Sequence, residues 1–186
     1  WNMQMFAAPG YVVVAPNPRG STGYGQQFTD EISQDWGGRV YVDLMKAYDY
    51  AIENYSFIDG NNTFAAGASY GGYMINWIAG HTDRFNALVS HAGVFNTESM
   101  YGTTEELWFV EWDLKGQPWN SEDYIKWSPS NYVENFSTPT LIITGKKDYR
   151  VSYNQSVHYF TDLQKMGVES RIIIFQNDGH WPSMVR

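Results

Sequence analysis

The sequence predicts an α/β protein in which a mostly parallel sheet carries helices on both faces. Short apolar segments rich in β-branched residues alternate with segments of helical periodicity. The apolar segments lack the polar alternation of half-exposed strands, which is typical of strands in a parallel sheet covered on both sides. With 186 residues, 43% of them hydrophobic, the chain is long enough for one domain spanning 1–186 with a substantial core.

Five apolar segments are the predicted strands: residues 11–16, 63–68, 87–91, 139–144 and 171–175. Apolar residues at helical spacing predict helices over 37–55, 70–81 and 153–167, with Gly167 closing the last one. Residues 95–137 are rich in aromatic residues and contain no clear strand, so we expect a helical excursion over the sheet. Helices between successive buried strands indicate parallel pairing through right-handed crossovers.

Composition excludes several classes of function. The formal net charge of −8 and the absence of a basic run argue against nucleic acid as a partner. The apolar runs are far shorter than the roughly 20 residues of a membrane-spanning helix, so no membrane partner is expected. The chain has no cysteine, which excludes disulfides and thiol catalysis, and no metal or cofactor is expected.

The segment GASYG, residues 67–71, has the form Gly-x-Ser-x-Gly and lies between a predicted strand and a predicted helix. This context is typical of a nucleophile elbow, a tight turn that raises a serine hydroxyl above the carboxyl edge of a sheet. Small flanking residues avoid collisions with the neighbouring strand and helix. Ser69 is therefore the candidate nucleophile. The alternative is a glycine-rich turn that lets a helix pack closely on the sheet.

A serine nucleophile requires a base and an orienting acid, which follow the serine in the order acid, then histidine, in folds with this elbow. His180 follows the last predicted strand, and Asp148 follows the strand before it. Asp178 lies in the same loop as His180, only two residues away, which makes it a poor orienting group. The remaining histidines lie within predicted helices or strands, where structural roles are favoured: His81, His91 and His158.

Six segments together resemble the catalytic domain of the prolyl oligopeptidase family of serine peptidases: NPRGSTGYG, DWGG…DL, GASYGGYM, WSPSNYV, DYRV and GHW. The similarity is greatest to the branch of dipeptidyl-peptidase V and acylaminoacyl-peptidase. It implies an α/β-hydrolase fold that cleaves short peptides near their N-terminus. Ser69, Asp148 and His180 match the family's nucleophile, acid and base. The resemblance also implies that the Tyr70 backbone N–H donates to the oxyanion and that Arg150 binds a substrate carbonyl.

The chain also departs from the family pattern. Family catalytic domains are longer and follow a β-propeller, which is expected in a full-length parent of this chain. The first strands of the hydrolase sheet, the loop with a second oxyanion donor and a final helix are absent from the sequence. We therefore expect a partial catalytic domain. Two other functions stay open: a carboxylesterase on the same fold, and an incomplete domain that acts only in binding or structure.

A pocket for the residue before the scissile bond is expected beside the serine. Its predicted wall comes from the elbow helix and from the segment after the third predicted strand, and its members are Tyr73, Val94, Phe95, Met100, Tyr101 and Trp108. For each of these residues, a place in the core is an equally good interpretation.

Four Asn-x-Ser/Thr sequons provide the only sequence information on the compartment: Asn54, Asn61, Asn135 and Asn154. They are candidate glycosylation sites and favour a secreted protein. The alternative is coincidence in an asparagine-rich chain, which leaves a cytoplasmic location open.

Overall fold

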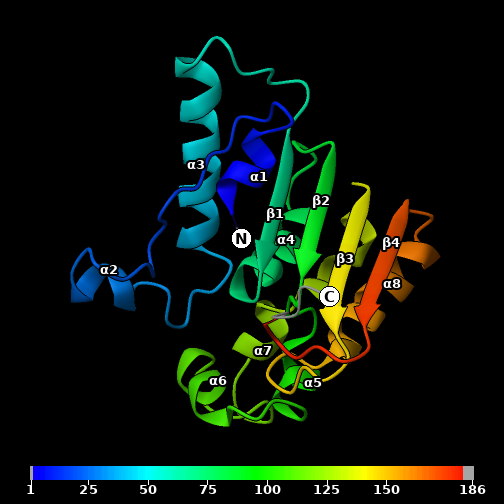
Figure 1. The fold of residues 1–186 in the computed structure, drawn as a ribbon. Helices are drawn as coiled ribbons and strands as arrows, with labels where there is room; N and C mark the ends of the chain where they lie inside the picture. Colours follow the sequence, from blue (N-terminus) through cyan, green and yellow to red (C-terminus); the bar gives the residue numbers. More distant parts are fainter. Residues whose placement is uncertain (1, 182–186) are drawn as a thin grey trace. The chain divides into compact units, whose positions relative to one another are not determined.

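The structure is a computed structural model that describes residues 2–181 (Figure 1). The chain divides into two compact units, Trp1–Asn61 and Asn62–Arg186, and each is described by itself. Within the described residues, none of the helices has the length and apolar character needed to cross a membrane.

The second unit contains a four-stranded parallel sheet (Figure 1). Its strands follow each other in space as they do in sequence: β1 (Phe64–Ala68), β2 (Ala87–His91), β3 (Thr140–Gly145) and β4 (Ser170–Phe175). All three neighbouring pairs are parallel. Four of the five predicted strands and their parallel pairing are thus confirmed, with boundaries that differ by at most one residue.

The predicted strand at 11–16 is wrong. This segment belongs to the first unit and has no regular secondary structure, and Val12 and Val14 are 49% and 50% exposed. A run of β-branched residues suits a buried strand, but a strand also needs a neighbour for its backbone hydrogen bonds. Among the described residues of this unit there is no other strand with which the segment could form a ladder.

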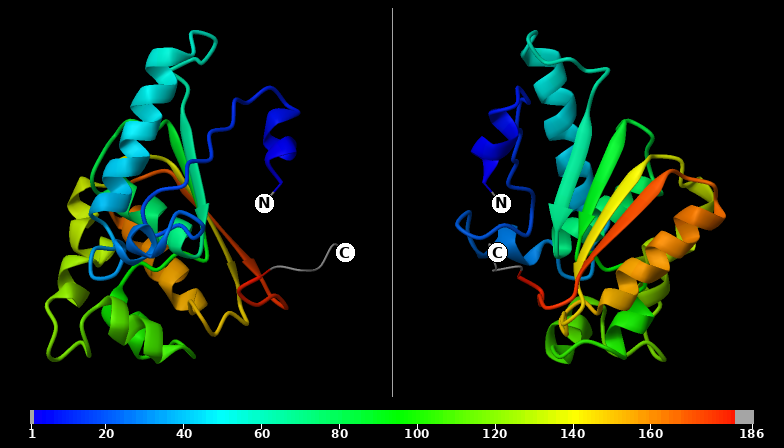
Figure 2. Two further views of the ribbon diagram at one scale, coloured as in Figure 1. Left: turned by 90° about the vertical axis from the view of Figure 1, so that its left-hand side faces the viewer. Right: turned by 45° about the vertical axis from the view of Figure 1, so that its right-hand side comes forward.

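Helices α4 (Tyr70–Ala79) and α8 (Tyr153–Lys165) pack on the same face of the sheet (Figure 2). Right-handed crossovers between strands that progress in one direction place their helices on one side. On that face, Leu88 of β2 and Ile142 of β3 are 1% exposed. The sequence predicted helices on both faces of the sheet, whereas α4 and α8 in this unit lie on the same face.

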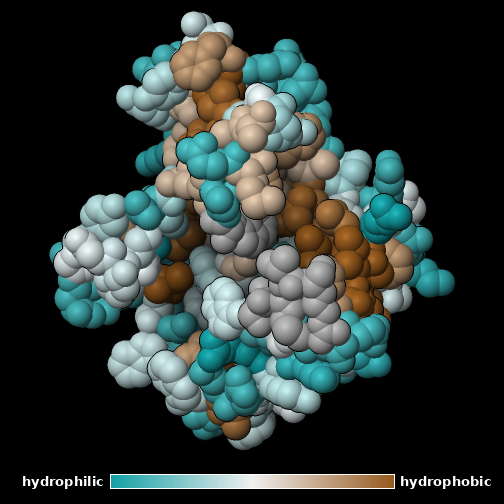
Figure 3. All heavy atoms as spheres, viewed as in Figure 1, coloured by the Kyte–Doolittle hydropathy of each residue, from teal (hydrophilic) through white to brown (hydrophobic). Residues whose placement is uncertain are grey.

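The opposite face of the sheet carries apolar side chains at the surface. Hydrophobic residues gather over β3 and β4 in Figure 3, and Ile173 and Phe175 of the edge strand β4 are 38% and 43% exposed. This face explains why burial alternates along β4, a strand that the sequence indicated as buried on both sides.

The excursion after β2 is helical, as predicted. It consists of α5 (Thr97–Tyr101), α6 (Leu107–Asp113), α7 (Asp123–Lys126) and the 3₁₀ helix η1 (Pro129–Asn135). The buried side chain of Gln155 attaches the first residues of this excursion to helix α8. Its Oε1 accepts hydrogen bonds from the backbone N–H groups of Phe95 and Asn96, both at 2.8 Å, and its Nε2 donates to Ser99 Oγ at 2.7 Å.

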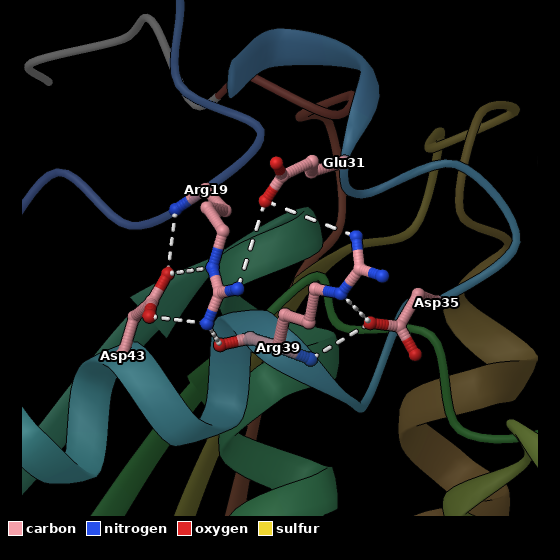
Figure 4. Close-up of polar contacts among 5 residues, drawn as sticks. All are labelled: Arg19, Glu31, Asp35, Arg39 and Asp43. Carbon is pink, nitrogen blue, oxygen red and sulfur yellow. Dashed lines mark hydrogen bonds and ion pairs between the residues drawn. The ribbon is translucent and has the colours of Figure 1, made fainter. Parts of the chain in front are cut away.

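The first unit contains α1 (Met3–Ala7), α2 (Gln26–Asp30) and α3 (Arg39–Asn54), the last of which is the helix predicted over 37–55. Its polar centre is the pair of Arg19 and Asp43 (Figure 4). Arg19 Nε and Nη2 donate to the two oxygens of Asp43 at 2.8 and 2.7 Å, and the Arg19 backbone N–H donates at 3.0 Å. These bonds hold the pKa of Asp43 below its usual range.

Two further acidic groups extend this pair into a network (Figure 4). Glu31 lies 3.6 Å from Arg19 and 3.8 Å from Arg39, and the Arg39 backbone N–H donates to Asp35 at 2.9 Å. The network therefore fastens the glycine-rich loop that contains Arg19 to the first turns of α3.

Candidate active site

Ser69 lies at the sharp turn between β1 and α4, as the elbow pattern predicts. Its backbone has φ 57° and ψ −120°, a conformation that non-glycine residues rarely adopt. The Ser69 N–H donates to the carbonyl of His91 on β2 at 2.9 Å, and the Ser69 carbonyl accepts from the Tyr73 N–H of α4 at 2.9 Å. The strained serine is thus fixed by both the sheet and the helix.

Close backbone approach explains the glycines around the serine. A Cβ at Gly67 would collide with the backbone carbonyl of Gly71, and one at Gly72 would collide with the carbonyl of His91. A Cβ at Gly71 itself would meet no atom within 4 Å. The collision predicted for the small residues of the GASYG motif is therefore found at Gly67 but not at Gly71, where the backbone itself makes the close contact. Gly72, which lies just outside the motif, has a similar constraint.

The side chains of Ser69, His180 and Asp148 form one hydrogen-bonded row. His180 Nε2 lies 2.8 Å from Ser69 Oγ, and His180 Nδ1 lies 2.7 Å from Asp148 Oδ2. A carboxylate can only accept, so this arrangement assigns the ring proton to Nδ1 and leaves Nε2 as acceptor for the serine hydroxyl. In this tautomer the imidazole can take a proton from Ser69.

The Asp148 carboxylate is buried and held from several sides. Its Oδ1 accepts the backbone N–H groups of Arg150 at 3.0 Å and Val151 at 2.9 Å, within the loop that follows β3. The two loops at this sheet edge are also joined, since the Lys147 N–H donates to the Asp178 carbonyl at 2.9 Å. The carboxylate is thereby oriented toward His180 by groups that do not titrate.

His91 is the second histidine at this edge of the sheet. It ends β2, it is 8% exposed, and burial lowers its pKa, with a further lowering from the charge of His180. A neutral His91 avoids repelling the imidazolium that His180 becomes when it accepts a proton. The burial of His91 is consistent with the structural role expected from the sequence.

Arg150 pairs with an acid that the sequence did not point out. Its Nη2 lies 2.8 Å from Glu106 Oε1, and its Nε is buried without a hydrogen-bond partner in the described part of the chain. Glu106 lies 44 positions away, in the excursion just before α6. No spacing rule links an acid in an irregular segment to a loop residue so far along the chain, so only the tertiary structure brings this pair to notice.

The six residues of the predicted pocket wall lie in different environments. The side chains of Tyr73, Val94, Phe95 and Met100 are at most 2% exposed and belong to the core, which was the alternative for each of them. Tyr101 is partly exposed and its hydroxyl donates to Glu111 at 2.9 Å, whereas Trp108 is 72% exposed. The contribution of all six residues to substrate binding stays a prediction.

Tyr70 is the first residue of α4, so its backbone N–H belongs to the N-terminus of that helix. The N–H groups of a first helical turn point outward along the axis and carry partial positive charge. During attack by a serine, negative charge develops on the carbonyl oxygen of the substrate, and the N–H of the residue directly after the serine is a typical donor to that oxygen.

A strained serine at a strand–helix turn, followed by an acid and a histidine at the carboxyl ends of two later parallel strands, defines the α/β-hydrolase class of fold. The family model "Prolyl oligopeptidase family" matches residues 1–186, and the chain belongs to this family.

Three known proteins are similar to most of this chain. Dipeptidyl-peptidase 5 of Schizosaccharomyces pombe is 47% identical over 184 residues, which are 97% of this chain and 27% of that protein. Acylaminoacyl peptidase of Pyrococcus horikoshii has a TM-score of 0.93 and 31% identity, with 96% of this chain and 29% of that chain covered. An acylaminoacyl peptidase in complex with Z-Gly-Gly-Phe-chloromethyl ketone has a TM-score of 0.85 and 32% identity, with 88% and 27% covered. The chain thus spans about a quarter of the length of the curated relatives that it matches.

Proposed function

We propose that this chain carries the catalytic centre of a serine peptidase that hydrolyses short peptides near their N-terminus through an acyl-enzyme. The observation that supports this most strongly is the row of hydrogen bonds from Ser69 through His180 to Asp148. We further propose that residues 1–186 are part of a catalytic domain in a longer protein that also contains a β-propeller. The relatives, which are about four times as long, are consistent with a larger parent.

The proposed mechanism follows the proton of the Ser69 hydroxyl through each step. His180 Nε2 takes the proton of Ser69 as Oγ forms a bond to the scissile carbonyl carbon, which gives a tetrahedral intermediate. The imidazolium then gives this proton to the leaving amine, the C–N bond breaks, and an ester to Ser69 remains. Water, activated by the same nitrogen, hydrolyses the ester and restores the hydroxyl. Asp148 holds the ring and stabilises its positive charge throughout.

The Tyr70 backbone N–H is the proposed donor to the oxyanion of the intermediate, supported by the N-terminus of α4. Removal of one such donor costs about 3–4 kcal/mol of transition-state stabilisation in other acyl-transfer enzymes. A second donor is expected from the parent protein outside this chain.

Arg150 is the proposed partner of a substrate carbonyl. Its guanidinium is about a third exposed, and its Nε lacks a hydrogen-bond partner in the described structure. The exposed N–H groups of this guanidinium can donate to a substrate carbonyl in a charge-assisted hydrogen bond, which is stronger than a neutral one. Of the six residues predicted for the pocket wall, the accessible Tyr101 and Trp108 are the ones proposed to contact the substrate, while Tyr73, Val94, Phe95 and Met100 are buried in the core.

The names of the relatives favour amide hydrolysis over the carboxylesterase and the purely structural alternatives. One relative is a dipeptidyl-peptidase, and two of the similar solved structures are acylaminoacyl peptidases, one of them with a peptidyl chloromethyl ketone. The two names describe different substrates, because a dipeptidyl-peptidase acts on peptides with a free amine and an acylaminoacyl peptidase on blocked ones.

The test is Ser69→Ala in the full-length protein, assayed with a dipeptide arylamide and with a fluorophosphonate that labels activated serines. We expect turnover to fall by several orders of magnitude and labelling to disappear. Ser170→Ala, at a serine of β4 whose hydroxyl donates to the Val168 carbonyl, is the matched control and should keep both. A Ser69→Ala variant with even a tenth of the original turnover would exclude this mechanism.

We also propose a secreted, glycosylated parent. All four sequon asparagines are exposed, but the side-chain nitrogens of Asn54 and Asn135 donate to backbone carbonyls at 2.8 and 3.0 Å. Within the described residues the side chains of Asn61 and Asn154 make no such bond, so we expect glycans there first. Glycopeptide mass spectrometry of the protein from its own secretory pathway checks this, and unmodified peptides at all four positions would contradict it.

A further inference from the structure

We propose that Trp181 binds the first residue on the leaving side of the scissile bond, and so makes the site favour peptides with an aromatic residue there. This role rests on the proposed peptidase function and specifies its substrate class. It starts from the contact of Trp181 with the catalytic base. The ring centroids of His180 and Trp181 lie 4.9 Å apart, with an angle of 76° between the ring planes.

Trp181 combines this contact with a large exposed surface. It is 65% exposed, whereas the side chains of His180 and Asp148 are 7% and 0% exposed. Single exposed apolar residues are ordinary at protein surfaces, and the helical excursion has several exposed tryptophans. Trp181 is distinguished by its contact with the group that transfers the proton. Because the imidazole itself is nearly covered, a group that approaches it from solvent meets the indole.

The backbone just before Trp181 is held against the end of β3. A Cβ at Gly145 would collide with the carbonyl oxygens of Asp178 and Gly179, so the two chain segments are in close contact there. This approach fixes the loop that leads into His180 and Trp181. An indole on a fixed backbone has only two side-chain torsions to lose, so binding a ligand costs it little conformational entropy.

The reaction brings the leaving residue to the same place. The imidazolium gives its proton to the leaving nitrogen, which requires a distance of about 2.6–3.2 Å between that nitrogen and His180 Nε2. The side chain of the leaving residue begins only two covalent bonds from this nitrogen. Aromatic rings contact each other at centroid separations of about 4.5–7 Å, so a ring in this side chain is within reach of the indole of Trp181.

This contact differs in its kinetic effect from those on the acyl side. The leaving residue is gone once the acyl-enzyme has formed, so a contact with it favours acylation and leaves deacylation unchanged. A role of Trp181 in holding the His180 ring would instead affect both steps, since the same imidazole acts in each. The two roles can therefore be separated by substrates that differ only in the leaving residue.

The test compares Trp181→Ala with the wild-type full-length protein on two peptide amides. Both have the same dipeptide as acyl half, and the leaving group is Phe-amide in one and Gly-amide in the other. In the wild type we expect kcat/KM to be about 5- to 20-fold higher for the Phe substrate, the range for partial burial of one aromatic side chain. Trp181→Ala should lower this ratio to below about 2 through a loss on the Phe substrate alone, and Trp181→Phe should give an intermediate ratio.

Capture of the acyl-enzyme by an added amine gives a second, independent measurement. The amine nitrogen attacks the ester carbon, its proton passes through His180 to Ser69 Oγ, and the ester C–O bond breaks to leave a new amide. With a dipeptide arylamide as acyl donor, Phe-amide should capture the wild-type acyl-enzyme about 5- to 20-fold better than Gly-amide. In Trp181→Ala this preference should disappear, while hydrolysis of the acyl-enzyme keeps its rate.

Trp112→Ala is the matched control, because Trp112 is a tryptophan of α6 with a comparable exposure of 72%. It should leave both ratios at their wild-type values. Equal losses on the Phe and Gly substrates in Trp181→Ala, an unchanged ratio, or the same change in Trp112→Ala would overturn the role of Trp181 while leaving the peptidase function intact. Wild-type protein that no fluorophosphonate labels at Ser69 would instead overturn the proposed function, and the role of Trp181 with it.

Discussion

Asp43 in the first unit and Asp148 in the second each accept three hydrogen bonds, yet the source of those bonds differs. Asp43 takes all three from one residue, Arg19. Asp148 takes two from backbone N–H groups of its own loop and the third from His180 in another loop. One carboxylate closes a local clamp between a loop and a helix, whereas the other aligns an imidazole that comes from another loop, 32 positions along the chain.

The two carboxylates also differ in their exposure to solvent. The side chains of Asp43 and Arg19 are about a quarter exposed, at 25% and 27%, whereas those of Asp148 and His180 are 0% and 7% exposed. Water screens the first pair, so its loss is expected to loosen the surrounding structure mildly. Water is excluded from the second, where each hydrogen bond is stronger and errors in geometry are not compensated. We therefore expect replacement of the aspartate to have a small effect on stability in the first unit and a large effect on catalysis in the second.

The largest effect is expected for Asp148→Asn in the full-length protein. The amide keeps the volume of the side chain, but its NH₂ can donate to His180 and favour the wrong tautomer, with the ring proton on Nε2. A comparable change in another serine peptidase lowers kcat by about 10⁴. We expect a loss of that order in the turnover of a dipeptide arylamide.

Asp178→Asn is the control for this variant, since Asp178 is the other acid of the histidine loop. In the part of the chain that the structure describes, it bonds to the acid loop through its backbone carbonyl and not through its carboxylate. It should retain activity within a few-fold. If both variants lost activity equally, the assignment of Asp148 as the orienting acid would be in doubt.

The sequence predicted the second unit much better than the first. Local sequence patterns predict the elbow and the parallel strands. They also predict the loops after β3 and β4, because each of these strands ends at turn residues that are recognisable in the sequence. The segment 11–16 has an equally strong strand pattern, but its pairing depends on neighbours outside the segment. Likewise Glu106 is one glutamate among many until the fold brings it to Arg150. Local patterns thus predict elements and their ends, while pairing partners between distant segments require the tertiary structure.

A smaller effect is expected for Asp43→Asn, which tests the other side of the comparison. The amide cannot accept all three bonds from Arg19 with full charge, so the loop around Arg19 and the first turns of α3 should open more often. Faster amide hydrogen exchange in these two segments of the full-length protein, without faster exchange in α4 or α8, is the expected result. Glu53→Gln, at an exposed acid near the end of the same helix, should leave the exchange unchanged.

The pH dependence of this effect has a defined sign. Arg19 lowers the pKa of Asp43 in the folded protein, so the unfolded chain binds the proton first as the pH falls. The stabilisation is therefore complete above the ordinary aspartate pKa of about 3.9 and is lost as the pH falls through the lower, folded value. The difference in exchange between Asp43→Asn and the wild type should accordingly be constant from neutral pH down to about pH 5, and should shrink below about pH 4. A difference that stayed the same at pH 3 would show that the Asp43 charge contributes nothing, and that the clamp depends on the shape of the side chain alone.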